Sequence, residues 1–374
     1  MGNNCGCFKN STDRGFQLDG QARPMDEESS ALKIQAAFRG NQVRKQVRAT
    51  NQENSLKNQQ SSEFTSAYEQ FTPEGNTAVT QLLLEKTNPK VMAVLNELGP
   101  FKYNEKLRIY DHLPTKPPTR LESGGIYVGQ WNGKTRHGKG KQYWPDGSIF
   151  EGYWEHDKAH GLGRLIHADG DYYEGNWCED KVSGRGKYVH PDGRYYEGDW
   201  VNEKQHGRGV EHYSDGSIYE GHFMEGMKHG FGDMKWPDHS RYVGDFNRNM
   251  IEGRGKYQWA DGRVYEGEWK NNKMHGEGVF TWSDGRRYEG SYQNDKKEGF
   301  GIYYLQDGKR YEGQWVNGKQ HGIGNYINAS GQARRGEWKD GKRVKWISDS
   351  LNPHNNDTTF EIKESAISTI KSSQ

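Results

Sequence analysis

Residues 127–149 read YVGQWNGKTRHGKGKQYWPDGSI, and variants of this 23-residue stretch follow one another in tandem. Each copy starts with an aromatic residue, has a glycine two positions later and has a second aromatic residue four positions later. The starting residues are Tyr127, Phe150, Tyr173, Tyr196, Tyr219, Tyr242, Tyr265, Tyr288 and Tyr311. A fixed period of this length is the signature of a repeat architecture, in which neighbouring units bury one another.

Each copy has the pattern of a β-hairpin. In the first strand, alternation places Tyr127, Gly129 and Trp131 on one face, because successive side chains point to opposite faces. A Gly-x-Gly pair lies in the second strand, and an Asp-Gly pair supplies the positive φ that tight turns require. We therefore expect nine antiparallel hairpins in tandem, which bury their aromatic faces against their neighbours.

A tenth copy is incomplete, because Arg334 stands where the tyrosine is expected while Gly336 and Trp338 remain. This is the pattern of a capping repeat. The predicted fold class is mainly β: an elongated single-sheet solenoid of stacked hairpins over residues 124–346, with an N-terminal helical or disordered region.

Composition agrees with this prediction and excludes several classes of protein. Only 31% of the residues are hydrophobic, yet 13% are aromatic and 49 are glycine, which favours short strands over a thick aliphatic core. The net charge of +1 gives no overall field for nucleic acid, so we expect no nucleic-acid partner. Three cysteines are too few for a disulfide framework, and no apolar run approaches the length that spans a bilayer.

The order Tyr-x-Gly-x-Trp, His-Gly-x-Gly and Asp-Gly at this period resembles the MORN (membrane occupation and recognition nexus) repeat family. The resemblance implies a scaffold or assembly module with cytoskeletal or ciliary protein partners, and some members of the family dimerise. Membrane-lipid binding has also been proposed for these repeats. An alternative function is therefore a phosphoinositide-binding or anionic-lipid-binding module that acts through the repeats.

Histidine recurs at one position of the copies: His137, His160, His206, His229, His275 and His321. Equivalent residues of adjacent copies lie two strands apart, about 9.5 Å, whereas zinc ligands lie about 2 Å from a shared ion. We therefore predict a structural role within each repeat and no metal site. No nucleophile elbow or other catalytic motif is present, so we predict no catalytic residues, no cofactor and no enzyme.

The N-terminus resembles an acylation signal. Gly2 follows the initiator methionine, as in myristoylated proteins, and Cys5 and Cys7 are candidates for palmitoylation. The usual Ser or Thr at position 6 is replaced by Gly6, and the alternative is an unmodified N-terminus. Two lipid chains would anchor the protein stably, whereas one would not. The expected location is the cytoplasmic face of a membrane, ciliary or in the cortical cytoskeleton.

A second short motif lies in a predicted helix over residues 24–48. The pattern IQ-x3-RG-x3-R is matched at all five defining positions: Ile34, Gln35, Arg39, Gly40 and Arg44. Phe38 lies one helical turn after Ile34 and extends an apolar face that is flanked by basic residues. This resemblance to IQ motifs predicts binding of calmodulin or a calmodulin-like EF-hand protein. The alternative is a basic amphipathic helix on an anionic membrane.

The remaining segments complete the predicted organisation. Residues 1–23 form the acylated or disordered N-terminus, and residues 347–374 a mobile polar tail. Residues 49–120 are a linker with a short helical hairpin at 77–98, interrupted near Asn88-Pro89, and an extended lead-in that contains Pro114, Pro117 and Pro118. We expect this region to cap the first hairpin, whose edge is otherwise unpaired. Together these features predict a membrane-tethered scaffold that binds calmodulin through its IQ helix and presents a long aromatic and polar groove of its repeats to other proteins. A homodimer is a further candidate partner.

Overall fold

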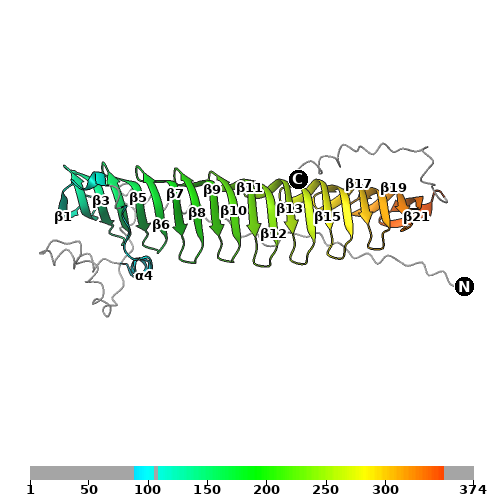
Figure 1. The fold of residues 1–374 in the computed structure, drawn as a ribbon, viewed down its shortest axis with the longest axis horizontal. Helices are drawn as coiled ribbons and strands as arrows, with labels where there is room; N and C mark the ends of the chain where they lie inside the picture. The colour runs from blue at the N-terminus through cyan, green and yellow to red at the C-terminus, as the bar shows by residue number, and fades with distance from the viewer. Residues whose placement is uncertain (1–87, 105–107, 349–374) are drawn as a thin grey trace, which may run out of the picture. The chain divides into compact units, whose positions relative to one another are not determined.

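The computed structural model of the protein describes residues 88–104 and 108–348, most of which lie in β-strands. The described strands belong to one open antiparallel sheet of 21 strands (Figure 1), so the predicted mainly-β single-sheet fold is confirmed. Helix α4 spans Pro89–Leu98 and the 3-10 helix η1 spans Arg108–Tyr110. The strands are β1 Thr115–Arg120, β2 Ile126–Asn132, β3 Thr135–Tyr143, β4 Ile149–Glu155, β5 Lys158–Ile166, β6 Tyr172–Cys178, β7 Lys181–Val189, β8 Tyr195–Val201, β9 Lys204–His212, β10 Ile218–Met224, β11 Met227–Lys235, β12 Arg241–Asn247, β13 Met250–Gln258, β14 Val264–Lys270, β15 Lys273–Thr281, β16 Arg287–Gln293, β17 Lys296–Tyr304, β18 Arg310–Val316, β19 Lys319–Ile327, β20 Ala333–Lys339 and β21 Lys342–Trp346.

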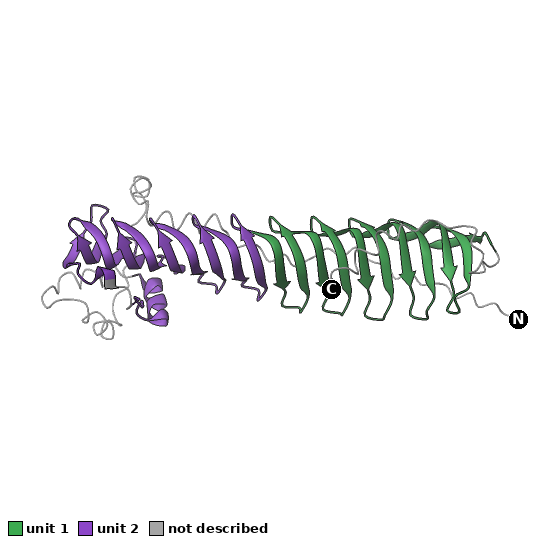
Figure 2. Ribbon diagram, turned by 45° about the horizontal axis from the view of Figure 1, so that its top comes forward, with its two compact units in different colours: residues 1–23, 228–374 green, residues 24–227 purple. Residues whose placement is uncertain are grey.

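The chain divides into two compact units, which Figure 2 colours separately. One comprises residues 24–227, and the other comprises residues 1–23 and 228–374. The same hairpin recurs in both, as β2 with β3 in the first unit and β12 with β13 in the second. One copy therefore explains the construction of each unit.

Two kinds of turn connect the strands. Within a copy the turn has two residues, such as His156 and Asp157 with φ of 48° and 66°. Positive φ at both positions gives the type I′ turn, whose twist matches that of the strands. Between copies, the backbone N–H of Trp144 donates to the carbonyl of Ser148 at 2.9 Å, and Gly147 has φ of 91°. The predicted role of the Asp-Gly pair in these turns is confirmed.

A bulge interrupts each hairpin. The register between β2 and β3 shifts between Gly129 and Trp131, opposite Gly138 with φ of 83°. A bulge bends a strand and increases its twist, which allows one sheet to curl around the side chains on one face. We call the face that carries Tyr127 and Trp131 the inner face, and the opposite face the outer face.

The inner face is the core of the protein. Tyr173 is 0% exposed and meets Trp177 and Trp200 edge to face, with ring centroids 5.3 and 5.5 Å apart. The indole N–H of Trp200 donates to the carbonyl of Gly186 at 3.0 Å. The predicted burial of aromatic faces between neighbouring hairpins is therefore confirmed. Each of these rings is covered by rings of its own copy and the next, so they do not line the groove that we expected to present to protein partners.

The segment before the repeats contains helix α4, whose two ends are set by capping residues. The Asn88 side chain caps α4 by accepting a hydrogen bond from the Lys90 N–H at 2.9 Å, and Pro89 occupies the first turn. Gly99 ends the helix with φ of 68°. The predicted end of the helical segment is thus confirmed, while residues 77–87, the first half of the predicted hairpin, lie outside the described residues.

The prediction that the segment before the repeats caps the first hairpin is confirmed. Strand β1, in the predicted linker, pairs with β2 and covers the edge of the first repeat. Helix α4 lies elsewhere on the sheet, with its fully buried Val91 packed against Ile149 and Ile166 on the outer face of β4 and β5. Pro117 and Pro118 lie in β1, since an edge strand tolerates residues without an N–H.

The tenth copy forms a complete hairpin. Strand β20 pairs with β19 and β21, and Trp338 is 5% exposed against Tyr311, with ring centroids 4.9 Å apart. The backbone N–H of Ile347 donates to the carbonyl of Arg335 at 2.8 Å, so the described chain stays on the sheet beyond β21. This hairpin covers the aromatic row of the ninth copy, as a cap requires.

Candidate functional site on the outer face

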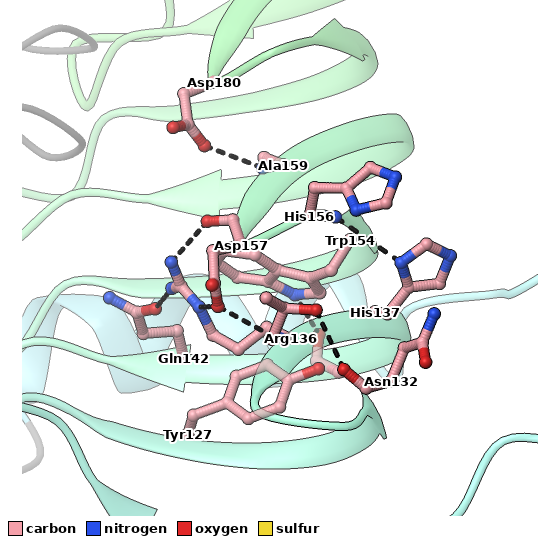
Figure 3. A network of polar contacts seen from close by, with 12 residues as sticks. Tyr127, Asn132, Arg136, His137, Gln142, Trp154, His156, Asp157, Ala159 and Asp180 are labelled. Carbon is pink, nitrogen blue, oxygen red and sulfur yellow. Dashed lines mark hydrogen bonds and ion pairs between the residues drawn. The ribbon is translucent and has the colours of Figure 1, made fainter.

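The turn of each copy is hydrogen-bonded to the copy before it (Figure 3). The carboxylate of Asp157 accepts from the backbone N–H of Arg136 at 2.8 Å and from its Nε at 3.2 Å. The Arg136 guanidinium lies 4.2 Å from the ring centroid of Trp154. The backbone contact recurs in further described pairs: Asp180 with Ala159, Asn249 with Lys228, Asn272 with Ile251 and Asp295 with Met274. These bonds hold the register between successive copies.

The position of the recurring histidines also contacts these two-residue turns, which we call the rim of the sheet. Nδ1 of His137 accepts from the backbone N–H of His156 at 3.4 Å, in the turn of the following copy. Glu298 occupies the equivalent position and accepts from the Asn317 N–H at 2.8 Å. These two contacts join consecutive repeats, whereas Nε2 of His160 lies 3.5 Å from the carboxylate of Glu155 in its own copy, which agrees with the predicted role within a repeat. Within residues 88–104 and 108–348, no three His, Cys, Asp or Glu side chains are placed to hold a metal ion.

The outer face of the first copies is covered by the segment that precedes them. The ring of Tyr103 packs edge to face on Tyr153, with centroids 5.4 Å apart, and burial raises the pKa of Tyr103 far above its usual value. The Arg164 guanidinium donates to the carbonyl of Gly99 at 2.8 Å and lies 5.6 Å from the ring centroid of Phe101. Residues 88–104 therefore act as a fixed part of this surface.

Where this cover ends, an open hollow of about 360 Å³ lies on the outer face. Its lining residues are Phe101, Lys102, Leu162, Gly163, Glu174, Gly175, Asn176, Arg185, Gly186, Lys187 and Glu197. The glycines expose backbone, Phe101 and Leu162 supply an apolar wall, and charged side chains of both signs surround it. We call this set of residues the outer-face hollow.

The charges around the hollow are only partly engaged with one another. Lys187 lies 3.8 Å from Glu197, and Glu174 lies 2.7 Å from the Nε of Arg164. The Asn176 side chain donates to the carbonyl of Arg185 at 3.0 Å. The Lys187–Glu197 pair is exposed and contributes little to stability, so these two groups can exchange partners at small cost, whereas Glu174 pairs with the buried Arg164. The hollow suits a ligand with one apolar group flanked by charged or polar atoms.

The short motifs of the N-terminal region remain predictions from sequence. The residues concerned all lie outside the described residues: Gly2, Cys5, Cys7, Ile34, Gln35, Phe38, Arg39, Gly40 and Arg44. Among the described residues, no helix has the length and apolar character needed to cross a membrane. The outer-face hollow was not predicted, because Phe101 and Leu162 are far apart in sequence and only folding brings them together.

Ten segments match the MORN repeat family: residues 127–149, 150–172, 173–193, 196–218, 219–241, 242–262, 265–286, 288–310, 311–333 and 335–344. The chain belongs to the MORN-repeat family. Residues 28–48 match the IQ calmodulin-binding motif. This range includes Ile34, Gln35, Phe38, Arg39, Gly40 and Arg44. This MORN-repeat protein therefore joins two modules whose families bind other proteins and are not catalytic.

Comparisons with whole proteins add less. A comparison with curated proteins gives no match. Among solved structures, the TCP10 domain of Danio rerio CPAP in complex with a STIL peptide is 14% identical, with a TM-score of 0.32, covering 62% of this chain and 98% of that one. The SAS-4 TCP domain of Drosophila melanogaster, in complex with a proline-rich motif of Ana2, is 12% identical, with a TM-score of 0.28, covering 53% and 99%. These scores are too low to support an inference about this chain.

Proposed function

We propose that this MORN-repeat protein is a non-enzymatic scaffold that connects an EF-hand calcium sensor to a membrane and to cytoskeletal or ciliary proteins. The IQ helix binds calmodulin or a calmodulin-like protein, the acylated N-terminus holds the chain on the cytoplasmic face of a membrane, and the repeats bind further proteins. The observation that carries the proposal is the IQ motif at residues 28–48, joined in one chain to ten MORN repeats.

The residues of the IQ motif explain the choice of partner. Ile34 and Phe38 are one helical turn apart and form an apolar anchor, while Arg39 and Arg44 supply positive charge on the same helix. Between Ala31 and Arg48 the sequence has no acidic residue. An EF-hand lobe offers the complementary surface, which is acidic and rich in methionine.

A binding experiment on the full chain tests this step. The variant Ile34→Ala with Gln35→Ala should reduce calmodulin capture at least about tenfold, since it removes an apolar anchor and a defining polar contact. Gln42→Ala changes a position that the motif leaves free and serves as the matched control. Capture should be measured with calcium and with a chelator. Equal capture by the two variants in both conditions would refute the assignment.

The membrane tether rests on Gly2 with Cys5 and Cys7, whose spacing allows one myristoyl and at least one palmitoyl chain. Two chains are needed because a single myristoyl group binds membranes only marginally. Mass spectrometry of the native N-terminal peptide tests the proposal directly. A free or acetylated Gly2 together with free thiols would remove the anchor from the proposed function.

For the repeats, the accessible binding surface is the outer face, since the inner rings are buried. The outer-face hollow carries Lys102, Arg185 and Lys187 beside Glu174 and Glu197, and this mixture suits a protein surface better than a polyanionic headgroup. Deleting residues 1–50 separates the two functions. If the shortened chain still binds vesicles that contain phosphoinositide, the repeats themselves recognise lipid and the scaffold proposal fails for this surface.

Self-association through the repeats is the remaining part of the proposal. Light scattering coupled to size-exclusion chromatography of the full chain, over a range of concentrations, tests it. A mass equal to one chain at every concentration would show that the scaffold acts as a monomer.

A further inference from the structure

The last two complete copies differ from the others on the outer face. Two outer-face positions flank the second glycine of each Gly-x-Gly pair, and charged residues are common there. In order of the copies these pairs are Lys139/Lys141, Leu162/Arg164, Arg185/Lys187, Arg208/Val210, Phe231/Asp233, Arg254/Lys256, Glu277/Val279, Phe300/Ile302 and Ile323/Asn325. Every pair before the last two contains a charged residue, and the last two contain none.

These uncharged positions form one surface. Phe300 is 45% exposed and Ile323 is 38% exposed, and they occupy equivalent positions on β17 and β19. Gln314 of β18 lies opposite Phe300 and is also uncharged. Two strand spacings separate Phe300 from Ile323, about 10 Å. We call Phe300, Ile302 and Ile323 the C-terminal apolar patch; Glu312 lies opposite Ile302 and Glu337 lies opposite Ile323 at its borders. Exposed apolar residues gathered on one face mark a candidate binding site.

The unit formed by residues 24–227 shows how such a surface is covered. There, the chain that adjoins the first repeat lies over the outer face, with Val91 on Ile149 and Ile166. Phe101, from the same adjoining segment, is only 9% exposed and shares the outer-face hollow with Leu162. A flanking segment of this chain thus already covers apolar residues on the outer face of the repeats beside it.

The chain leaves the last hairpin close to the C-terminal apolar patch. Ile347 and Ser348 are bonded to Arg335, which lies opposite Asn325 on β19. Asn325 lies opposite Glu312 of β18, and Glu312 lies opposite Ile302 of β17. Arg335 is therefore three strand spacings from the patch, about 15 Å. Eleven residues, 349–359, span up to about 36 Å when extended, which is more than enough to reach it.

We propose that residues 358–370 of the same chain cover the C-terminal apolar patch. This segment contains the large apolar residues Phe360, Ile362, Ile367 and Ile370 among polar neighbours. Phe360 and Ile362 are two positions apart, as are Phe300 and Ile302, so an extended segment can set one pair over the other. Burial of these side chains removes apolar surface from water on both partners, which is the driving force for the contact.

Hydrogen–deuterium exchange of the full chain tests the proposal. Amides of residues 358–370 should exchange at least about tenfold more slowly than in the free synthetic peptide. Phe300→Ser with Ile323→Ser should return them to the rate of the peptide. Phe231→Ser is the matched control, because Phe231 is 59% exposed on the outer face of the same unit and lies outside the patch. It should leave the tail protected.

A second measurement does not depend on the folding of the patch variants. Phe360→Ser with Ile362→Ser changes only the tail and should increase binding of an apolar fluorescent dye by uncovering the patch. Free-peptide exchange rates in the natural chain, unchanged rates in the patch variant, or unchanged dye binding in the tail variant would each overturn the proposal. Protection that grows with protein concentration would assign the patch to a second copy and overturn it as well.

Discussion

Gly163 lies at a close approach between the aromatic core and the backbone, and replacing it tests the account of the core. A Cβ atom at this position would lie 2.5 Å from Cζ of Phe150 and 3.1 Å from Cδ1 of Trp177. Carbon atoms in contact are about 3.5 Å or more apart, so the Phe150 ring would have to move by about 1 Å. That ring is fully buried and packs edge to face on Trp154 and Trp177, at centroid distances of 5.0 and 5.3 Å.

The magnitude follows from these contacts. Overpacking a core costs about 1–3 kcal/mol, and disturbing each edge-to-face ring contact costs about 0.5–1.5 kcal/mol. The smaller backbone freedom of alanine in the unfolded chain returns less than about 1 kcal/mol. Gly163→Ala should therefore lower the free energy of unfolding by about 2–3 kcal/mol, measured by urea unfolding of the full chain followed by circular dichroism.

A double-mutant cycle separates ring overlap from other effects. Phe150→Leu shortens the side chain under the new methyl group, so the double variant should be at least about 1 kcal/mol more stable than the sum of the single changes implies. Gly193→Ala is the control: no atom lies within 4 Å of its Cβ position, and its φ of 86° carries only a backbone cost. A loss below about 1 kcal/mol for Gly163→Ala, or zero coupling to Phe150, would refute the reasoning.

Three further predictions concern the rim and the core. Burial raises the pKa of Asp180, whose carboxylate accepts a hydrogen bond from Ala159 at 2.7 Å, so its ionised form weakens folding at neutral pH. Asp180→Asn should therefore stabilise the protein at pH 7 in thermal unfolding scans. This gain should disappear below about pH 4, where the aspartate is protonated in both the folded and the unfolded chain. Asp157→Asn should instead destabilise the protein, because Asp157 forms an ion pair with Arg136. Asn272→Ala should lower the free energy of unfolding in urea by about 1 kcal/mol more than Asn271→Ala. Both residues have positive φ, but only the Asn272 side chain accepts a hydrogen bond from the Ile251 N–H. Equal losses of stability would contradict a role for this hydrogen bond. The ammonium of Lys297 lies 4.7–5.2 Å from the ring centroids of Trp282, Tyr288, Tyr303 and Trp315. Lys297→Met should therefore lower the free energy of unfolding by about 1 kcal/mol, whereas Lys296→Met, at an exposed position, should leave the urea midpoint unchanged. No loss of stability in Lys297→Met would exclude a cation–π contribution.

The hairpins could be predicted because each depends on residues within 23 positions of one another. The turn residues, the alternation of Tyr127, Gly129 and Trp131, and the tandem copies are local features that are repeated many times. The tandem arrangement also predicted that the aromatic faces are buried against neighbouring hairpins. It did not show that each ring is covered by rings of its own copy and the next, which leaves none of these rings in a groove for partners.

The candidate site divides in a similar way. The IQ residues form a contiguous motif, so their chemistry can be read directly from the chain and agrees with the family match. The outer-face hollow combines Phe101 with Leu162 and Lys187. The local sequence around each of these residues does not predict that the other two lie beside it in the folded chain. The histidines fall between the two cases: their period was visible, but their contact with the turn of the next copy depends on how the copies stack.

By itself, the sequence determined the repeat length, the strand faces, the turns and the family, because each of these follows from interactions between near neighbours in the chain. Tertiary structure decided which surfaces are buried and which are accessible. The curl of the sheet buried the aromatic rows, and the path of residues 88–104 covered one part of the outer face and left the hollow beside it. Such contacts join residues distant in sequence, and their geometry is set by packing, which no local pattern encodes.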